Sequence, residues 1–260
     1  MRRDIEDWCR RCELCSRRKP PTPRSKAPME IVKAGEPMQR VAIDVLGPLP
    51  ETYNGNKYIL VVADYFTKWT EAYPIPNQEA KTVASELVTN FIARFGVPQI
   101  IHSDQGSNFE SELFGELCKC LGIHKTRTTA YRPQSDGLVE RFNRTLEQMI
   151  SVYVHENQRD WDVHIPILLM AYRSSLQETT RFTPNFLMLG RETTLPIELM
   201  IGSPEAESNP DTNVPEYVAN FKDRCNKAYR VVRERTSLSQ ARQKKNYDAH
   251  ICSKTTPLRW

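Results

Sequence analysis

The sequence predicts an α/β domain with a mixed sheet, preceded by a short Cys-rich segment and followed by a basic helix. Short apolar runs of strand length alternate with amphipathic stretches of helix length between about residues 40 and 202. The length of 260 residues and the 39% of hydrophobic residues allow a sizeable buried core. No apolar run of about 18 residues occurs, so we expect no membrane-spanning helix.

Five short stretches have the composition of strands. The clearest is the continuous apolar run at residues 58–63, which is typical of a strand buried on both faces. The pair Asn54 and Gly55 just before it indicates a turn. Strands are expected at residues 41–45, 58–63, 69–75, 99–102 and 123–128.

Helical periodicity separates these strands. Apolar residues recur every fourth position from Val83 to Phe95, and Gly96 and Pro98 end this pattern. Another helix begins near Ser135 or Asp136, and its apolar stripe comprises Leu138, Phe142, Leu146, Met149, Ile150 and Tyr153. Helices are expected at residues 79–94, about 110–121, from 135 or 136 onward and about 215–247. The order β-β-β-α-β-α-β-α predicts a mixed sheet flanked by helices.

Three carboxylates occupy positions where catalytic sites form in α/β proteins. Asp44 ends the first expected strand, Asp104 follows the fourth, and Glu140 lies one turn into the helix after the fifth. Carboxylates that converge from separate elements suit Mg²⁺, and two such ions can promote in-line phosphoryl displacement. The spacing alone is weak evidence, because 32 acidic residues in the chain produce such pairs by chance. No Walker-type loop occurs, which argues against an NTPase.

Charge is distributed unevenly along the chain. Residues 1–33 carry 10 Lys/Arg against 5 Asp/Glu, residues 34–202 carry 15 against 20, and residues 203–260 carry 11 against 7. Basic ends suit a phosphate backbone, whereas an acidic middle suits a site for divalent cations. Ordinary solvated surface charge is the alternative interpretation.

Several sequence blocks, in their correct order, resemble the integrases of retroviruses and of gypsy-type LTR retrotransposons, and the gypsy type more closely. The first and second catalytic blocks correspond to residues 42–50 (AIDVLGPLP) and 102–109 (HSDQGSNF). The third corresponds to residues 131–146 (YRPQSDGLVERFNRTL). Residues 64–74 (DYFTKWTEAYP), 171–174 (AYRS) and 183–191 resemble the family's second and third strands and downstream helices. The resemblance spans about residues 38–202.

The resemblance implies an RNase H-like fold with a mixed five-stranded sheet and a D,D-35-E triad formed by Asp44, Asp104 and Glu140. It implies a polynucleotidyl transferase that uses Mg²⁺ (or Mn²⁺) in strand transfer, in which a DNA 3′-hydroxyl attacks a target phosphodiester. Asp44 would bridge both metal ions, Asp104 would hold one and Glu140 the other. The implied partners are element ends and target DNA. The implied active form is a homo-oligomer in the nucleus, with the cytoplasm as an alternative location before integration.

Polar residues around the third block are candidate DNA contacts that position the phosphate backbone. These are Arg132, Gln134, Arg141, Asn143 and Arg144. Asn143 and Arg144 follow Glu140 by three and four residues, which places them on its face of an expected helix. For each arginine, a surface salt bridge is an equally good interpretation.

The terminal regions depart from the family pattern. Cys12 and Cys15 resemble the second half of a His-His-Cys-Cys zinc module, with Cys9 as a third sulfur, but no histidine precedes them. The sequence therefore leaves zinc binding open. The expected domains are a remnant of the zinc module (1–20), a linker (21–37), the catalytic core (38–202) and a linker with a basic helical tail (203–260). In the family such a helix precedes a small β-barrel, which we expect to be missing here.

Two functions of different classes remain open from the sequence. The first is a DNA integrase, either transposon-derived or a Pol polyprotein fragment. The alternative is a catalytically inactive transposon-derived protein that binds DNA or another partner. An intact triad favours the enzyme, because random change removes carboxylates as readily as other residues. The basic helix at residues 215–247 either contacts DNA or is a solvated linker.

Overall fold

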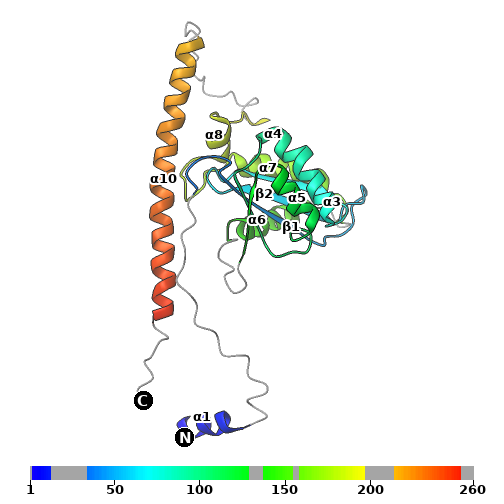
Figure 1. The fold of residues 1–260 in the computed structure, drawn as a ribbon, viewed down its shortest axis with the longest axis vertical. Coiled ribbons are helices and arrows are strands. Elements are labelled where there is room, and N and C mark those ends of the chain that lie inside the picture. Colours follow the sequence, from blue (N-terminus) through cyan, green and yellow to red (C-terminus); the bar gives the residue numbers. More distant parts are fainter. Residues whose placement is uncertain (1, 13–33, 129–136, 155–157, 197–213, 253–260) are drawn as a thin grey trace. The chain divides into compact units, whose positions relative to one another are not determined.

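The computed structural model describes residues 2–12, 34–128, 137–154, 158–196 and 214–252 (Figure 1). The chain divides into two compact units. The larger comprises Ile31–Ala241, and the smaller combines Met1–Glu30 with Arg242–Trp260. The smaller unit contains helix α1 (Arg2–Arg11), which the sequence did not predict. Among the helices in the described ranges, none combines the length and the apolar character needed to cross a bilayer.

A five-stranded mixed sheet forms the centre of the larger unit. Its strands are β1 (Arg40–Leu46), β2 (Tyr58–Asp64), β3 (Thr70–Ile75), β4 (Ile100–Ser103) and β5 (His124–Arg127). They lie in the order β3-β2-β1-β4-β5. Strand β2 is antiparallel to both β1 and β3, whereas β1, β4 and β5 are parallel to one another. The predicted α/β class with a mixed five-stranded sheet is therefore confirmed.

Helices lie on the two faces of this sheet (Figure 1). The described helices of the larger unit are α3 (Ala80–Glu86), η1 (Leu87–Ile92), α4 (Ala93–Phe95), α5 (Glu112–Cys120), α6 (Gly137–Tyr153), α7 (Trp161–Arg173), α8 (Pro184–Leu189) and the first part of α10 (Val214–Cys252). The helix expected at residues 79–94 is thus one continuous run through α3, η1 and α4, whose middle is π-helical. Gly96 ends it with a φ of 85°.

Side chains of successive strand residues enter opposite core layers, as the two-residue period of a strand requires. On β1, Val41 and Ile43 pack with α3, η1 and α5, whereas Ala42 packs with α6 and α7. The central strand β2 contributes to both layers, since Leu60 and Val62 enter the first and Ile59, Val61 and Ala63 the second. Burial on both faces explains the continuous apolar run at residues 58–63.

Helix α10 packs on the core within the larger unit. Ala228 and Val232 are buried in a third apolar cluster with Phe66 and Leu187. Hydrogen bonds reinforce this packing: the Tyr229 hydroxyl donates to the Leu187 carbonyl at 3.1 Å, and Arg224 Nη2 donates to the Gly190 carbonyl at 3.2 Å. Arg233 Nε donates to the Gly35 carbonyl. This part of α10 is therefore an integral part of the compact unit, which extends to Ala241.

Gly190 is the position at which the packing of α10 can be tested. It ends α8 in the left-handed region with a φ of 72°, and a Cβ atom there would overlap the ring of Phe221 on α10. We expect Gly190→Ala to lower the free energy of unfolding by about 1–3 kcal/mol, because it combines backbone strain with overpacking. Urea denaturation measures this change, and limited proteolysis of α10 should show faster cleavage.

The matched control is Gly115→Ala within α5, where a new Cβ atom meets no atom within 4 Å. That substitution should stabilise the chain by about 0.5–1 kcal/mol, because alanine has the higher helix propensity. Equal stability and equal proteolysis of α10 in both variants would show that α10 does not depend on its contact with α8.

Candidate active site

Asp44 lies on β1 and faces the layer that contains α6. Its position follows from strand alternation, since Ala42 two residues earlier enters the same layer. The backbone N–H of Val45 donates to Asp44 Oδ1 at 2.8 Å, and Asn143 Nδ2 on α6 donates to Asp44 Oδ2 at 2.8 Å. Both carboxylate oxygens therefore have a fixed partner.

Asp104 directly follows β4, which pairs parallel with β1 in the register Ala42–His102. Parallel neighbours end at the same edge of a sheet, so this pairing brings Asp104 toward Asp44. The backbone N–H of Gly106 donates to Asp104 Oδ1 at 2.9 Å. A Cβ atom on Gly106 would lie 2.5 Å from Asn108 Oδ1 and 3.0 Å from Asp104 Oδ1, so glycine permits this close approach.

Glu140 is exposed in the first turn of α6. The same helix carries Asn143 one turn later, so α6 supplies one carboxylate and the amide that holds another. Gln105 Nε2 donates to the Thr128 carbonyl at 2.7 Å, which ties the Asp104 loop to the chain just after β5. The predicted triad thus comes from three separate elements: β1, the loop after β4 and the start of α6.

Electrostatics show that these three carboxyl groups share one region. The pKa of Asp44 is raised to about 6, first by burial and then, more weakly, by the negative charges of Asp104 and Glu140. The hydrogen bonds from Val45 and Asn143 oppose this rise, because they favour the ionised form. The negative charges of Asp104 and Glu140 therefore both repel a negative charge on Asp44, as expected for a site that takes up a cation.

The donor set fits a hard divalent cation, since all three predicted ligands are carboxylates and their repulsion would fall when a cation bound. The Oδ1 atom of Asn143 is also buried without a hydrogen-bond partner among the described residues. In the same ranges, no group of three His, Cys, Asp or Glu side chains is already gathered closely enough to hold a metal ion.

Asn143 lies elsewhere than the sequence suggested. It is 9% exposed and points to Asp44, whereas we had placed it on the exposed face of Glu140 as a DNA contact. Val139 and Leu146, four residues before and three after it, are both buried, so Asn143 lies at the border of the apolar stripe. Including Val139 in that stripe would have revealed this position from the sequence.

Of the other four candidate DNA contacts, the structure describes two. Arg141 and Arg144 are exposed on α6, next to Glu140. Arg132 and Gln134 lie outside the described residues, as does Cys15 of the candidate zinc site. Cys12 follows helix α1, and its backbone N–H donates to the Trp8 carbonyl at 3.1 Å. The contacts with DNA and with zinc stay predictions.

Asp64 begins the block at residues 64–74 that resembles the family, but its role in the structure is structural. It is 1% exposed and accepts hydrogen bonds from the backbone N–H of Met38 and from both the N–H and the hydroxyl of Thr67. These bonds fix the turn between β2 and β3. Its oxygens are therefore already used within the fold, which separates it from the triad.

Residues 34–133 match the family model for the integrase core domain, a range that includes Asp44 and Asp104 but not Glu140. The chain therefore contains an integrase core domain of the retroviral type.

Named relatives agree with this assignment. The retrovirus-related Pol polyprotein from transposon 412 of Drosophila melanogaster is 31% identical over 225 residues, which cover 86% of this chain and 18% of that protein. The Pol polyprotein of radiation murine leukemia virus (strain Kaplan) is 34% identical over 199 residues, which cover 74% of this chain and 32% of that protein. The chain thus spans less than a third of the length of either relative.

Among solved structures, a chain of the simian T-cell lymphotropic virus intasome in complex with the PP2A regulatory subunit B56 gamma has a similar fold. The superposition has a TM-score of 0.55 at 21% sequence identity and covers 75% of this chain and 69% of that chain. This likeness supports the RNase H-like fold that the sequence blocks implied.

The raised pKa of Asp44 has a measurable effect on stability in the absence of metal. Folding raises this pKa from 3.8 to about 6, so the stability that the protonated group provides is present below pH 3.8 and is lost as the pH rises through about 6. We expect Asp44→Asn to be more stable than the wild type at pH 8 by about 1–2 kcal/mol, with a difference that grows between pH 4 and 7.

Urea denaturation in EDTA across this pH range measures the difference. The matched control is Asp223→Asn on α10, which also removes a carboxylate but from a side chain that is 61% exposed, and its effect on stability should be smaller than that of Asp44→Asn. A difference for Asp44→Asn that is flat or that shrinks with rising pH would contradict the burial of this charge.

Proposed function

We propose that this chain is the catalytic core of a DNA integrase, a polynucleotidyl transferase that joins 3′ ends of element DNA to target DNA. The observation that supports the proposal is that the negative charges of Asp104 and Glu140 lie near enough to Asp44 to help raise the pKa of that carboxyl to about 6. In the reaction, a bond forms between the attacking 3′ oxygen and the target phosphorus. The bond from phosphorus to the target 3′ oxygen breaks, and that oxygen leaves with a proton as a new 3′-hydroxyl.

Asp44, Asp104 and Glu140 would hold two Mg²⁺ or Mn²⁺ ions. When bound, such ions activate the attacking oxygen and stabilise the charge on the leaving oxygen. Neighbouring groups of the chain hold two of these carboxylates in place. Asn143 and the N–H of Val45 fix the two oxygens of Asp44, and the N–H of Gly106 orients Asp104.

The wider setting is part of the same proposal. We place the reaction in the nucleus, where chromosomal target DNA lies, and expect a homo-oligomer to hold two element ends together. The core would occupy residues 38–202, preceded by the zinc-module remnant and linker and followed by the basic helical tail. The relatives are Pol polyproteins of much greater length, which is consistent with a catalytic segment of a larger product.

Strand transfer can be tested directly with the full chain, a donor duplex with a recessed 3′ end and a supercoiled target, in Mg²⁺ or Mn²⁺. We expect joined products from the wild type, and a loss of on the order of 100-fold or more in Glu140→Gln. The control is Glu147→Gln, which removes another exposed carboxylate of α6 two turns away and should leave joining intact.

The alternative, an inactive DNA-binding remnant, predicts a different outcome. An inactive remnant would bind DNA without joining it, in either metal, and Glu140→Gln would change nothing. Equal amounts of joined product from the wild type and Glu140→Gln would likewise show that the triad takes no part in the reaction.

Metal binding provides a readout that is independent of joining. Protons and cations compete for Asp44, so the apparent affinity for Mn²⁺ should rise steeply as the pH passes about 6. Asn143→Ala removes the donor to Asp44 Oδ2 and should weaken Mn²⁺ binding by roughly 10–100-fold. Isothermal titration across pH measures both effects, and binding that is independent of pH and of Asn143 would refute the assignment of Asp44 as a ligand.

A further inference from the structure

Lys68 occupies a strained backbone position in the turn between β2 and β3. Its φ of 63° lies in the left-handed region, which favours glycine and costs a lysine backbone energy. The turn imposes this conformation, because the Lys68 N–H donates to the Asp64 carbonyl at 3.1 Å and the Asp64 N–H donates to the Trp69 carbonyl at 2.9 Å. Glycine would close the same turn without strain, and strained residues of this kind cluster at functional sites.

The ammonium group of Lys68 is only partly used by the fold. Nζ donates to the Tyr65 carbonyl at 2.7 Å, and the side chain is partly exposed. An ammonium has three N–H donors. Within the described ranges, Lys68 has neither a second hydrogen-bond acceptor nor an ion-pair partner. The nearby carboxylate of Asp64 already accepts hydrogen bonds at both oxygens. Donors of Lys68 therefore remain for a ligand.

Arg141 is a second cation beside this turn. It is exposed on α6 and directly follows Glu140 in the chain. The turn lies against the first turns of α6, because Tyr65 packs on the apolar cluster that contains Val139 and Phe142. Packing thus holds a lysine of the turn and an arginine of α6 next to a carboxylate of the triad.

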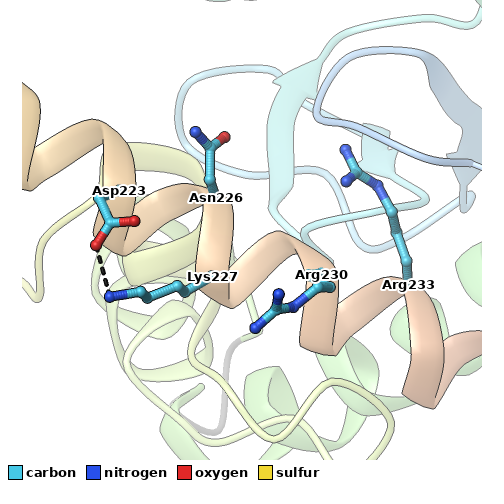
Figure 2. A pocket seen from close by; sticks show the side chains of 5 residues that line it. All are labelled: Asp223, Asn226, Lys227, Arg230 and Arg233. Atoms are coloured by element: carbon cyan, nitrogen blue, oxygen red, sulfur yellow. Dashed lines mark ion pairs between the residues drawn. The ribbon is translucent and has the colours of Figure 1, made fainter.

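The two cations lie close enough to interact electrostatically. Burial lowers the pKa of Lys68 to about 8; the negative charge of Asp64 opposes this change, and the positive charge of Arg141 adds to it. Both side chains are therefore mainly charged at neutral pH. Neither has an ion-pair partner among the residues that the structure describes. In the hollow on α10, by contrast, Lys227 is paired with Asp223 at 2.6 Å (Figure 2).

Arg40 adds positive charge to the same region. Its Cζ atom lies 5.2 Å from the centroid of the Tyr65 ring, and its Nε atom is buried without a hydrogen-bond partner in the described part of the chain. Arg40 and Asp44 lie four residues apart on one face of β1, a separation of about 13 Å. A DNA strand spans this distance in about four nucleotides. The cations are thus within reach of a strand whose phosphate lies at the triad.

We propose that Lys68 and Arg141 together bind a backbone phosphate of DNA a few nucleotides from the reacting one, and so position the DNA at the triad. A phosphodiester fits two unpaired cations, since its oxygens accept from both an ammonium and a guanidinium. The contact reads no bases. It rests on the proposed function, because the DNA is the substrate of the same core.

The first test measures DNA binding without joining. The full chain is titrated in Mn²⁺ with a fluorescent donor duplex whose recessed 3′ end lacks the hydroxyl, and anisotropy is followed over a series of KCl concentrations. Lys68→Gly should lower the slope of log affinity against log salt concentration by about 1. The loss of affinity between 50 and 200 mM KCl then becomes about threefold smaller.

Matched variants separate this contact from a general loss of charge. Lys68→Arg keeps the charge and should keep the slope of the wild type, as should Lys81→Gln, which removes an exposed lysine of α3. Arg141→Gln should act like Lys68→Gly. The double variant should lose less than the sum of both effects, because the two side chains share one phosphate. Full additivity, or an equal effect of Lys81→Gln, would overturn the proposal.

Urea denaturation distinguishes phosphate binding from a purely structural role of Lys68. Lys68→Gly should leave the unfolding midpoint unchanged or higher, because glycine relieves the strained φ. A lower midpoint together with an unchanged salt slope would show that Lys68 only anchors the turn through the Tyr65 carbonyl.

Neutral linkages locate the phosphate. Single methylphosphonates are placed at each of the four nucleotides next to the donor end or, in a second series, around the centre of a fluorescent target duplex with unlabelled donor present. At the contacted position, the wild type and Lys68→Gly should bind equally well. A position in the donor assigns the contact to element DNA, and one in the target assigns it to target DNA. Equalisation at no position contradicts the contact.

These measurements separate the phosphate contact from the triad, because none of them requires joining. A chain that joins DNA with a Glu140 dependence but shows no effect of Lys68→Gly retains the enzyme and loses the contact. A chain that shows the Lys68 effect but never joins DNA retains the contact and loses the proposed enzyme.

Discussion

Burial of the Asp44 carboxyl between the sheet and α6 is the constraint on which the site depends. A carboxylate there is costly to ionise, which its raised pKa of about 6 reflects. The cost is reduced by two fixed donors, the N–H of Val45 and the amide of Asn143. Because β4 pairs parallel with β1, the chain then delivers Asp104 to the same edge of the sheet. The fold thus brings negative charges together where a cation is the natural counter-charge.

Helix α6 couples core packing to site geometry. Val139, Phe142 and Leu146 fill one core layer, while the next position around the helix holds Asn143 against Asp44. Glu140 lies one turn earlier on the exposed side of the same helix. A rotation of α6 by repacking of its apolar stripe would therefore move an acidic ligand and the amide that orients another. The positions of Glu140 and Asn143 therefore depend on how the apolar face of α6 packs in the core.

Local patterns predicted most of the fold, because strands and helices of this domain are specified by neighbouring residues. The apolar run of β2 and the strand ends that carry Asp44 and Asp104 are of this kind. Contacts between distant segments could not be predicted. Ala228 and Val232 are sparse among the charges of α10, and their burial depends on Phe66, about 160 residues earlier. The distances among the triad carboxylates also depend on how separate elements pack, which spacing in the sequence does not encode.

The acidic residues of the candidate site and the basic residues of α10 would have opposite effects on the binding of DNA. A cluster of carboxylates that attracts Mg²⁺ also repels DNA, whose backbone is a dense row of negative charge. In the proposed reaction, bound cations would cancel this repulsion at the reacting phosphate, but neighbouring phosphates would still face the acidic residues of the core. Positive charge must therefore lie on another element, near enough to attract the duplex and far enough to leave the carboxylates unpaired. Packing α10 on the core through Ala228 and Val232 places the cations of this helix on the same compact unit as the three carboxylates.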